Sequence, residues 1–298
     1  MRVWVPYPEL VPRLPAALAV DVYDGAGPVP DTADEVQLYV TPYLFDLAPL
    51  ELMAGMPKLR VVQTLTAGYE HVLPYLPDGV TLCNAGPLHD TSTAELAVTL
   101  MLASLRGVPD FVRGQDAGQW RHQRWSSLAD STVLIVGYGG IGAAVERRLA
   151  GFEMDVLRVA RRERDGVAGI AALPDLLPRA DVVVLCVPLT EQTRGMVDAA
   201  FLARMRDGAL LVNVARGAVV DTDALVAELA TGRLRAALDV TEPEPPPPGH
   251  PLWTLPGVLL SPHVGGNSAA FLPRAHALIV EQLRRFAAGE PLRYVVRP

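Results

Sequence analysis

The chain has 298 residues, of which half are hydrophobic and 20% are charged, and its formal net charge is −7. This length predicts about two domains with buried cores, and the acidic balance excludes a general attraction to nucleic acid or to anionic membranes. No apolar run reaches the roughly 18 residues of a membrane span, and the proline-broken start MRVWVPYPEL is not typical of a signal peptide. We therefore expect a cytoplasmic protein whose partner is a small molecule, with no nucleic acid and no membrane.

The N-terminal third alternates short β-rich runs with turns and helical segments. Such alternation predicts a parallel α/β unit. A segment of helical character covers residues 44–56. The β-rich runs cover residues 3–5, 18–22, 36–40, 59–65 and 80–83.

A long helix is expected next, over residues 91–113, with little polar face. An apolar surface on all sides predicts burial, here between two domains. From residue 132 six apolar runs are separated by helical segments, which predicts a doubly wound nucleotide-binding domain. The runs cover residues 133–136, 154–159, 182–187, 209–214, 234–238 and 258–260.

The C-terminal helix 269–288 and the short tail 291–298 follow the last predicted strand of that domain, and no further strand of the domain remains for them to pack on or pair with. We expect them to return to the N-terminal domain. The two cysteines, Cys83 and Cys186, lie in or beside apolar runs and have neither a metal-binding nor a disulfide spacing. We interpret both as reduced structural thiols and expect no metal site.

The glycine-rich motif VGYGGIG occupies residues 136–142, between an apolar run and a helix-forming segment. This is the context that the dinucleotide fingerprint GxGxxG requires. Gly137 allows the tight turn, Gly139 lets the backbone approach a pyrophosphate, and Gly142 allows the helix to pack on the strand. The motif predicts a nucleotide site.

Four more stretches follow strand ends, where an open α/β sheet binds its ligands. Residues 64–69 run into a small-residue turn that either binds a carboxylate through its N–H groups or is only a surface turn. Arg216 ends the run VNVAR, where a guanidinium either grips a carboxylate and a carbonyl oxygen or makes a structural salt bridge. Asp239, Glu242 and Glu244 follow another run, and Glu242 is interpreted as solvated.

His263 closes the last run, between a proline and two glycines. The other five histidines look like surface or capping residues, which a lone histidine generally is. They are His71, His89, His122, His250 and His276. A cofactor cradle, an arginine, a proton-moving histidine and a carboxylate are the parts needed to reduce a carbonyl beside a carboxylate.

The chain resembles the D-isomer-specific 2-hydroxyacid dehydrogenase family over nearly its whole length. The motifs occur in the family's order: LRVVQTLTAGYEHV, VGYGGIG, CVPLTEQTRGMVD, LLVNVARGAVVD, AALDVTEPEP and HPLWTLPGVLLSPHVGG. The resemblance implies two doubly wound parallel-sheet domains, with a Rossmann cofactor domain inserted in a flavodoxin-like substrate domain. Residues 1–94 and 268–298 would form the substrate domain and residues 95–267 the cofactor domain, with the active-site cleft between them, and the protein would be a homodimer.

The resemblance also implies roles for individual residues. Arg216 would orient the keto acid, His263 would be the general acid and base, and Glu244, five residues after Asp239, would keep the imidazolium charged. The turn Ala67, Gly68 and Tyr69 would bind the substrate carboxylate together with Arg216 and His263. The expected cofactor contacts are Gly137, Tyr138, Gly139, Gly140, Ile141, Gly142, Arg161, Arg162, Cys186, Pro188, Thr193, Val214, Ala215, Arg216, Asp239, His263 and Gly265.

Two positions depart from the family pattern. Members that use NAD commonly carry an acidic residue about 20 residues past the glycines, whereas this chain continues into Arg161 and Arg162. Two guanidiniums favour a 2′-phosphate, and therefore NADP(H), although NAD(H) remains possible if Glu163 or Asp165 binds the ribose. Gly140 stands where the family often has a basic residue, which leaves only backbone contacts to the pyrophosphate.

The sequence therefore predicts an NAD(P)-dependent oxidoreductase of small 2-keto or 2-hydroxy acids, such as glyoxylate or hydroxypyruvate. An alternative of a different class is a dinucleotide-sensing protein of the same fold that acts as a transcriptional co-regulator, because a sensor can retain catalytic residues.

Overall fold

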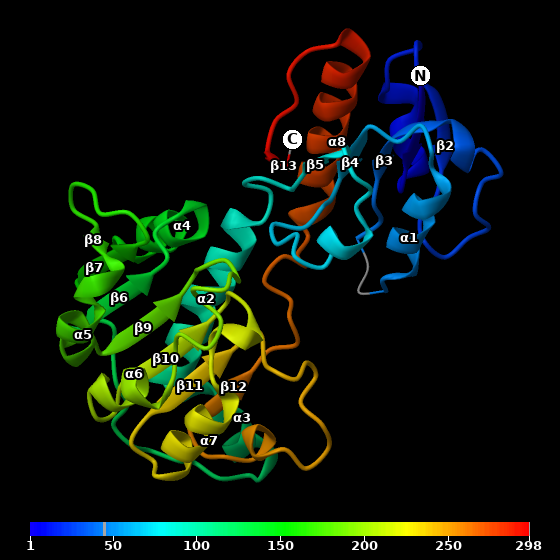
Figure 1. The fold of residues 1–298 in the computed structure, drawn as a ribbon. Coiled ribbons are helices and arrows are strands. Elements are labelled where there is room, and N and C mark those ends of the chain that lie inside the picture. Colours follow the sequence, from blue (N-terminus) through cyan, green and yellow to red (C-terminus); the bar gives the residue numbers. More distant parts are fainter. Residues whose placement is uncertain (44–45, 298) are drawn as a thin grey trace. The chain divides into compact units, whose positions relative to one another are not determined.

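The computed structural model describes residues 1–43 and 46–297. It divides into two compact α/β units, one formed by Met1–His89 with the segment that begins at Ala269, the other by Asp90–Ser268 (Figure 1). Each unit is described by itself. None of the described helices is long and apolar enough to cross a membrane.

The first unit contains a six-stranded sheet with the order β13-β5-β4-β3-β1-β2. Omitting β13, this is the 2-1-3-4-5 order of flavodoxin-like folds. The edge strand β13 pairs antiparallel with β5, and it lies in the tail, where the sequence predicted no strand. The strands are β1 (Arg2–Val5), β2 (Ala19–Val22), β3 (Val36–Val40), β4 (Val61–Gln63), β5 (Thr81–Cys83) and β13 (Val295–Arg297).

Two helices cover this sheet because successive strand residues point to opposite faces. Val3 and Val5 of β1 pack with the apolar side of α8 (Phe271–Ala288), and Trp4 between them packs on the other face with Leu50 of α1 (Ala48–Glu51). The predicted helix 44–56 is α-helical only over α1, with a 3₁₀ turn after it. Residues 44–45 lie outside the described part, and Pro49 favours a helix start close before it.

The second unit has a fully parallel sheet with the order β12-β11-β10-β9-β6-β7-β8. Counted from β6, its first six strands follow the 3-2-1-4-5-6 order of the Rossmann fold. The predicted fold class is thus confirmed, although the two-residue strand β8 was too short to be recognised as an apolar run. The strands are β6 (Thr132–Val136), β7 (Asp155–Ala160), β8 (Ala168–Gly169), β9 (Val182–Leu185), β10 (Leu210–Asn213), β11 (Arg235–Leu238) and β12 (Val258–Leu260).

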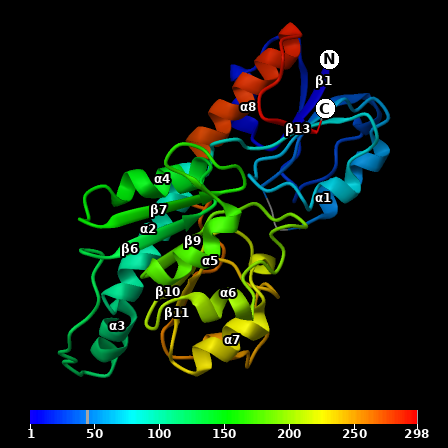
Figure 2. The same ribbon diagram turned by 60° about the vertical axis from the view of Figure 1, so that its left-hand side comes forward.

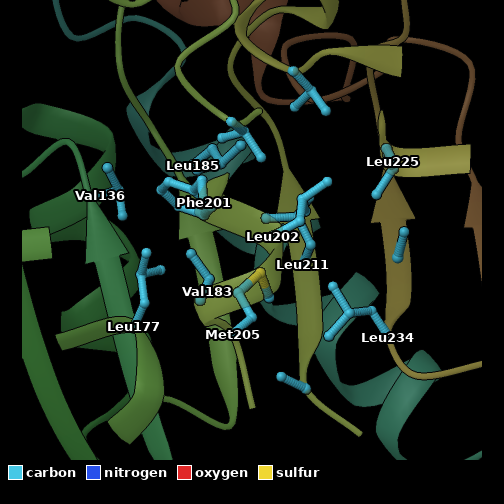
Figure 3. Close-up of a cluster of buried hydrophobic side chains, with 14 of the residues drawn as sticks. Val136, Leu177, Val183, Leu185, Phe201, Leu202, Met205, Leu211, Leu225 and Leu234 are labelled. Carbon is cyan, nitrogen blue, oxygen red and sulfur yellow. The ribbon is translucent and has the colours of Figure 1, made fainter. Parts of the chain in front are cut away.

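Helices lie on both faces of this sheet (Figure 2). The cluster in Figure 3 joins Val136, Val183 and Leu211 to side chains such as Leu202 of α6. The alternate residues Val133, Ile135, Val184 and Val212 pack with α2 and α4 on the opposite face. The helices are α2 (Asp90–Leu105), α3 (Val108–Asp116), α4 (Gly140–Leu149), α5 (Leu173–Leu176), α6 (Ala199–Arg204) and α7 (Thr222–Ala230).

The predicted single helix over residues 91–113 is wrong, because it is broken between α2 and α3. Gly107 has φ of +68°, and a Cβ there would overlap the ring of Trp125. Pro109 in the first turn of α3 also suits a new helix start. Helix α2 contacts α4, β10 and β11 within its own unit.

Candidate active site

The glycine-rich turn joins β6 to α4 and leaves no room for a side chain at two of its glycines. Gly137 has φ of +103°, and a Cβ there would lie 2.6 Å from the carbonyl oxygen of Cys186. A Cβ on Gly142 would overlap the carbonyl oxygen of Gly137. At Gly139 a Cβ would meet nothing within 4 Å, so the backbone is open where a pyrophosphate would approach. The geometry of the turn therefore fits a dinucleotide.

Helix α4 begins directly after this turn, at Gly140. Its first N–H groups have no intrahelical acceptor and its dipole favours an anion. A Cβ on Gly140 would overlap the carboxylate of Asp90 in its present position. Burial raises the pKa of Asp90, while the charge of Arg147 opposes that rise.

Tyr138 lies in a charged cluster beside the glycines. Its hydroxyl donates to Glu146, whose carboxylate also accepts from Nε and Nη2 of Arg158. The Nη2 group of Arg164 donates to the backbone oxygen of Tyr138 at 2.6 Å, and its guanidinium carbon lies 5.6 Å from the centre of the Tyr138 ring. Arg164 thus holds the glycine-rich turn, a role that the sequence did not reveal.

Arg161 and Arg162 follow β7 directly, and both are exposed. Within residues 1–43 and 46–297, neither guanidinium has an ion pair or a hydrogen bond. Glu163 and Asp165 are exposed as well. The end of β7 therefore presents two basic side chains at the surface, with acidic side chains beyond them.

The loop after β9 is tied by the hydroxyl of Thr193, which donates to the Pro188 oxygen at 2.6 Å and accepts from the Thr190 N–H at 2.8 Å. The residue before the loop, Cys186, is only partly exposed, and burial raises the pKa of its thiol to about 12. Both cysteines are free thiols, and Cys83 is buried.

Arg216 is carried by a short loop after β10. Asn213 shapes this loop, because its Nδ2 donates to the Arg216 oxygen at 3.0 Å and its Oδ1 accepts from the Ala215 N–H at 3.0 Å. A Cβ on Gly217 would overlap the Thr241 oxygen, so the loops after β10 and β11 touch through backbone. Val214 and Ala215 are buried, which leaves Arg216 as the half-buried polar group at this strand end.

Asp239 organises the turn that carries His263. The carboxylate is buried and accepts from Ser261 Oγ at 2.6 Å, from the Val264 N–H at 2.9 Å and from the Gly265 N–H at 2.9 Å. The backbone oxygen of Asp239 accepts from the His263 N–H at 2.9 Å. These bonds hold His263 at φ of +52°, an uncommon conformation for a residue with a side chain. Ser261 and this role of Asp239 were not foreseen.

The imidazole of His263 contacts Glu244, and its Nδ1 lies 2.6 Å from Oε1 of that carboxylate. Burial by itself would raise the pKa of Glu244, but the hydrogen bond and charge of His263, with smaller contributions from Thr241 and Arg216, bring it below its ordinary value of 4.5. A carboxylate at Nδ1 orients the ring.

In the other unit, the turn Ala67, Gly68 and Tyr69 follows β4 and is partly buried. Two of its carbonyl groups are held from within that unit. Asn84 Nδ2 donates to the Ala67 oxygen at 2.8 Å, and Thr66 Oγ1 donates to the Gly68 oxygen at 2.7 Å. Among the described residues, no protein group accepts from the N–H of Gly68 or of Tyr69.

Of the other histidines, His250 caps a 3₁₀ turn as predicted, through Nδ1 to the Leu252 N–H at 3.3 Å. The surface interpretation of His89 is wrong, because His89 is 6% exposed and its Nε2 lies 2.7 Å from the Leu65 oxygen. Within the described ranges, no three His, Cys, Asp or Glu side chains are grouped to hold a metal ion.

Residues 98–265 match the model of the D-isomer specific 2-hydroxyacid dehydrogenase NAD binding domain. The chain belongs to the D-isomer specific 2-hydroxyacid dehydrogenase family. This confirms the predicted family and the prediction of an NAD(P)-dependent 2-hydroxyacid dehydrogenase, and the cofactor is a nicotinamide dinucleotide.

Individual relatives cover most of the chain. Glyoxylate reductase from Pyrococcus horikoshii is 35% identical over 86% of this chain and 81% of its own length. The structure of a D-isomer specific 2-hydroxyacid dehydrogenase from Xanthobacter autotrophicus Py2 in complex with NADPH and MES has a TM-score of 0.83, with 33% identity over 100% of this chain and 98% of that one. An NADPH-dependent glyoxylate/hydroxypyruvate reductase from Sinorhizobium meliloti, in complex with NADP and sulfate, also has a TM-score of 0.83, with 30% identity over 99% of this chain and 98% of that one.

Proposed function

We propose that the protein reduces small 2-keto acids, such as glyoxylate or hydroxypyruvate, to 2-hydroxy acids and that it favours NADPH over NADH. The observation that carries this proposal is the 2.6 Å pair of His263 and Glu244 on the strand ends of a Rossmann unit whose glycine-rich turn fits a dinucleotide. Relatives named glyoxylate reductase support the choice of substrate.

Each protein group has a defined task in this reaction. When bound, the nicotinamide supplies the hydride that forms the new C–H bond at the keto carbon. His263 delivers the proton that the keto oxygen needs, and Glu244 stabilises the imidazolium before that transfer. Arg216 polarises the keto oxygen and binds the carboxylate through its fork of donors. The free N–H groups of Gly68 and Tyr69 bind the carboxylate as well.

The preference for NADPH is supported by Arg161 and Arg162, which are exposed and unpaired among the described residues at the end of β7. An adenosine 2′-phosphate would meet both guanidiniums, whereas the ribose hydroxyls of NADH would find no carboxylate at the strand end. We expect the dinucleotide contacts to come from the glycine-rich turn and from the loops after β9, β10, β11 and β12.

The test is a panel of glyoxylate, hydroxypyruvate and pyruvate, assayed with each reduced cofactor. We expect turnover with kcat/KM at least about ten-fold higher for NADPH than for NADH, because a hydrogen bond to a charged group contributes about 1.5–3 kcal/mol. The double variant Arg161→Ala/Arg162→Ala should lose that preference, while Arg179→Ala, another exposed arginine of the same unit, should keep it. A clear preference of the wild type for NADH would refute the cofactor assignment, and absence of turnover would favour a sensor.

We also propose a homodimer in which α3 and the segment after it form the interface. Val108, Phe111 and Val112 of α3 are 42–53% exposed, and Trp120 is 95% exposed. Aromatic and arginine side chains are enriched in interface cores, and Arg121 lies beside Trp120. Acidic Asp110 on α3 and basic Arg121 provide the opposite charges that a two-fold, self-complementary surface needs. Light scattering of the purified protein should give twice the mass of the chain, and a monomer would contradict the proposal.

A further inference from the structure

The loop formed by residues 64–69 rests on three amide side chains that come from distant parts of the sequence. Gln63 ends β4, Asn84 follows β5, and Gln282 lies on α8. Gln63 and Gln282 are 0% and 1% exposed. Buried amides require hydrogen-bond partners for their polar atoms. The partners of these amides therefore show which backbone groups of the loop are fixed.

Gln63 joins the two strand ends. Its Nε2 donates to the Thr64 oxygen at 2.8 Å and to the Asn84 oxygen at 2.9 Å, and its Oε1 accepts from Gln282 Nε2 at 2.6 Å. Gln282 in turn donates to the Arg293 oxygen at 3.0 Å and accepts from the Arg293 N–H at 2.9 Å. A buried network whose members are all satisfied is rigid. The backbone at Thr64 and Asn84 is therefore fixed.

Two side chains on this fixed base then hold the turn itself. Asn84 accepts from the Gly86 N–H at 3.0 Å, which orients its amide so that Nδ2 donates to the Ala67 oxygen at 2.8 Å. The Thr66 hydroxyl donates to the Gly68 oxygen at 2.7 Å, and it lies 2.7 Å from the hydroxyl of Thr64. Because Thr66 already donates to Gly68, the hydroxyl of Thr64 must be the donor in that second pair.

These bonds determine where the N–H groups of the turn point. In a planar trans peptide the C=O of one residue and the N–H of the next point in opposite directions. Holding the Ala67 oxygen toward Asn84 therefore turns the Gly68 N–H away from the unit's polar network, and holding the Gly68 oxygen toward Thr66 does the same for the Tyr69 N–H. Both N–H groups lack a protein acceptor within the described ranges, so the turn offers two adjacent donors to an anion.

We propose that Asn84 and Thr66 are positioning residues that aim the N–H groups of Gly68 and Tyr69 at the substrate carboxylate and thereby set the affinity for 2-keto acids. This rests on the proposed function, in which the turn binds that carboxylate. Neither side chain touches the substrate. Both act through the peptide planes of residues 67–69.

The experiment compares Asn84→Asp and Thr66→Val with the wild type. Asn84→Asp replaces the Nδ2 donor with an oxygen that repels the Ala67 carbonyl, and Thr66→Val removes only the hydroxyl. Thr66→Ser restores a hydroxyl, and Thr81→Val makes the same chemical change on β5, where the hydroxyl has no hydrogen bond among the described residues. Each protein is assayed for kcat and KM with glyoxylate, for Kd with oxalate, a dicarboxylate that cannot be reduced, and for Kd with NADPH.

We expect Asn84→Asp and Thr66→Val to raise KM for glyoxylate and Kd for oxalate about ten-fold, which is the loss of one well-aligned hydrogen bond to a charged group. The kcat should change less than about three-fold, and the Kd of NADPH should not change. Thr66→Ser and Thr81→Val should behave like the wild type. If Asn84→Asp fails to fold, the comparison of Thr66→Val with Thr66→Ser tests the positioning role.

An oxalate Kd within two-fold of the wild type in folded Thr66→Val would overturn the positioning role. That result is distinct from failure of the proposed function, which would appear in the wild type itself as no turnover of glyoxylate and no binding of oxalate. An equal rise in the Kd of NADPH would show a general structural defect and would also refute the proposal.

Discussion

The two α/β units carry their polar groups on the same kind of scaffold but use opposite chemistry. Both have parallel strands whose ends open into short loops, and both have an apolar core on each face of the sheet. The Asp90–Ser268 unit places charged side chains at those ends, namely Arg216, Glu244 and His263. The unit formed by both chain ends places neutral amides and hydroxyls there, which orient backbone N–H groups. In the proposed reaction, one unit supplies proton transfer and the other supplies binding of the carboxylate.

This contrast predicts that substitutions of the charged groups reduce kcat, whereas the amide and hydroxyl substitutions at Asn84 and Thr66 raise KM. The largest effect is expected for His263→Ala. Removing the general acid should lower kcat by about 10²- to 10⁴-fold, while the Kd of NADPH should change far less. Steady-state kinetics with glyoxylate and a fluorescence titration with NADPH measure the two quantities. His276→Ala, on α8 of the other unit, is the control, and full turnover of His263→Ala would remove the proposed acid.

Arg216→Lys comes next, with an expected loss of about 10²-fold in kcat/KM for the keto acid. An ammonium keeps the charge but cannot reproduce the two parallel donors of a guanidinium. The control is Arg204→Lys, an exposed arginine at the end of α6. If kcat/KM of Arg216→Lys equals that of the wild type, Arg216 has a structural role and does not bind the keto acid. The proposed difference in chemistry between the two units would then rest on His263 and Glu244 alone.

Glu244→Gln should have the smallest effect of the three, and it should depend on pH. The pKa of Glu244 is lowered on folding, so its carboxylate is fully present above pH 4.5 and is lost only as the pH falls through the lower folded value. A glutamine imitates the protonated carboxyl group, so the variant should differ from the wild type above pH 4.5, and the two should converge as the pH falls through the lowered pKa of Glu244. Above pH 4.5 we expect about a ten-fold lower kcat/KM, because a hydrogen bond to a charged group contributes about 1.5–3 kcal/mol.

The neighbouring carboxylate offers a matched control, since Glu242 is exposed and its side chain has no hydrogen bond or ion pair among the described residues. Glu242→Gln should leave the pH profile of kcat/KM unchanged. Identical profiles for Glu244→Gln and the wild type would mean that the charge of Glu244 does not contribute to the reaction through the 2.6 Å contact.

The sequence predicted most of the strands and the glycine-rich turn, because apolar periodicity and glycine positions are local signals. The strand predicted at residues 36–40 is β3, and the run 258–260 is β12. The sequence did not reveal the break at Gly107, because the apolar pattern continues across this position. The left-handed backbone there follows from packing against Trp125. The antiparallel strand β13 was missed as well, because its partner β5 lies about 210 residues earlier in the chain.

By itself the sequence determined which chemical groups are available: a dinucleotide turn, two arginines after β7, and an arginine, a glutamate and a histidine in the family's order. Only the tertiary structure decided how they are held. Asp239 supports the His263 turn from 26 residues away, and Gln282 supports the loop 64–69 through Gln63, 219 residues away. The physical reason is that side-chain type is a local property, whereas the direction of an N–H group or an imidazole is set by hydrogen bonds to residues that only the fold brings together.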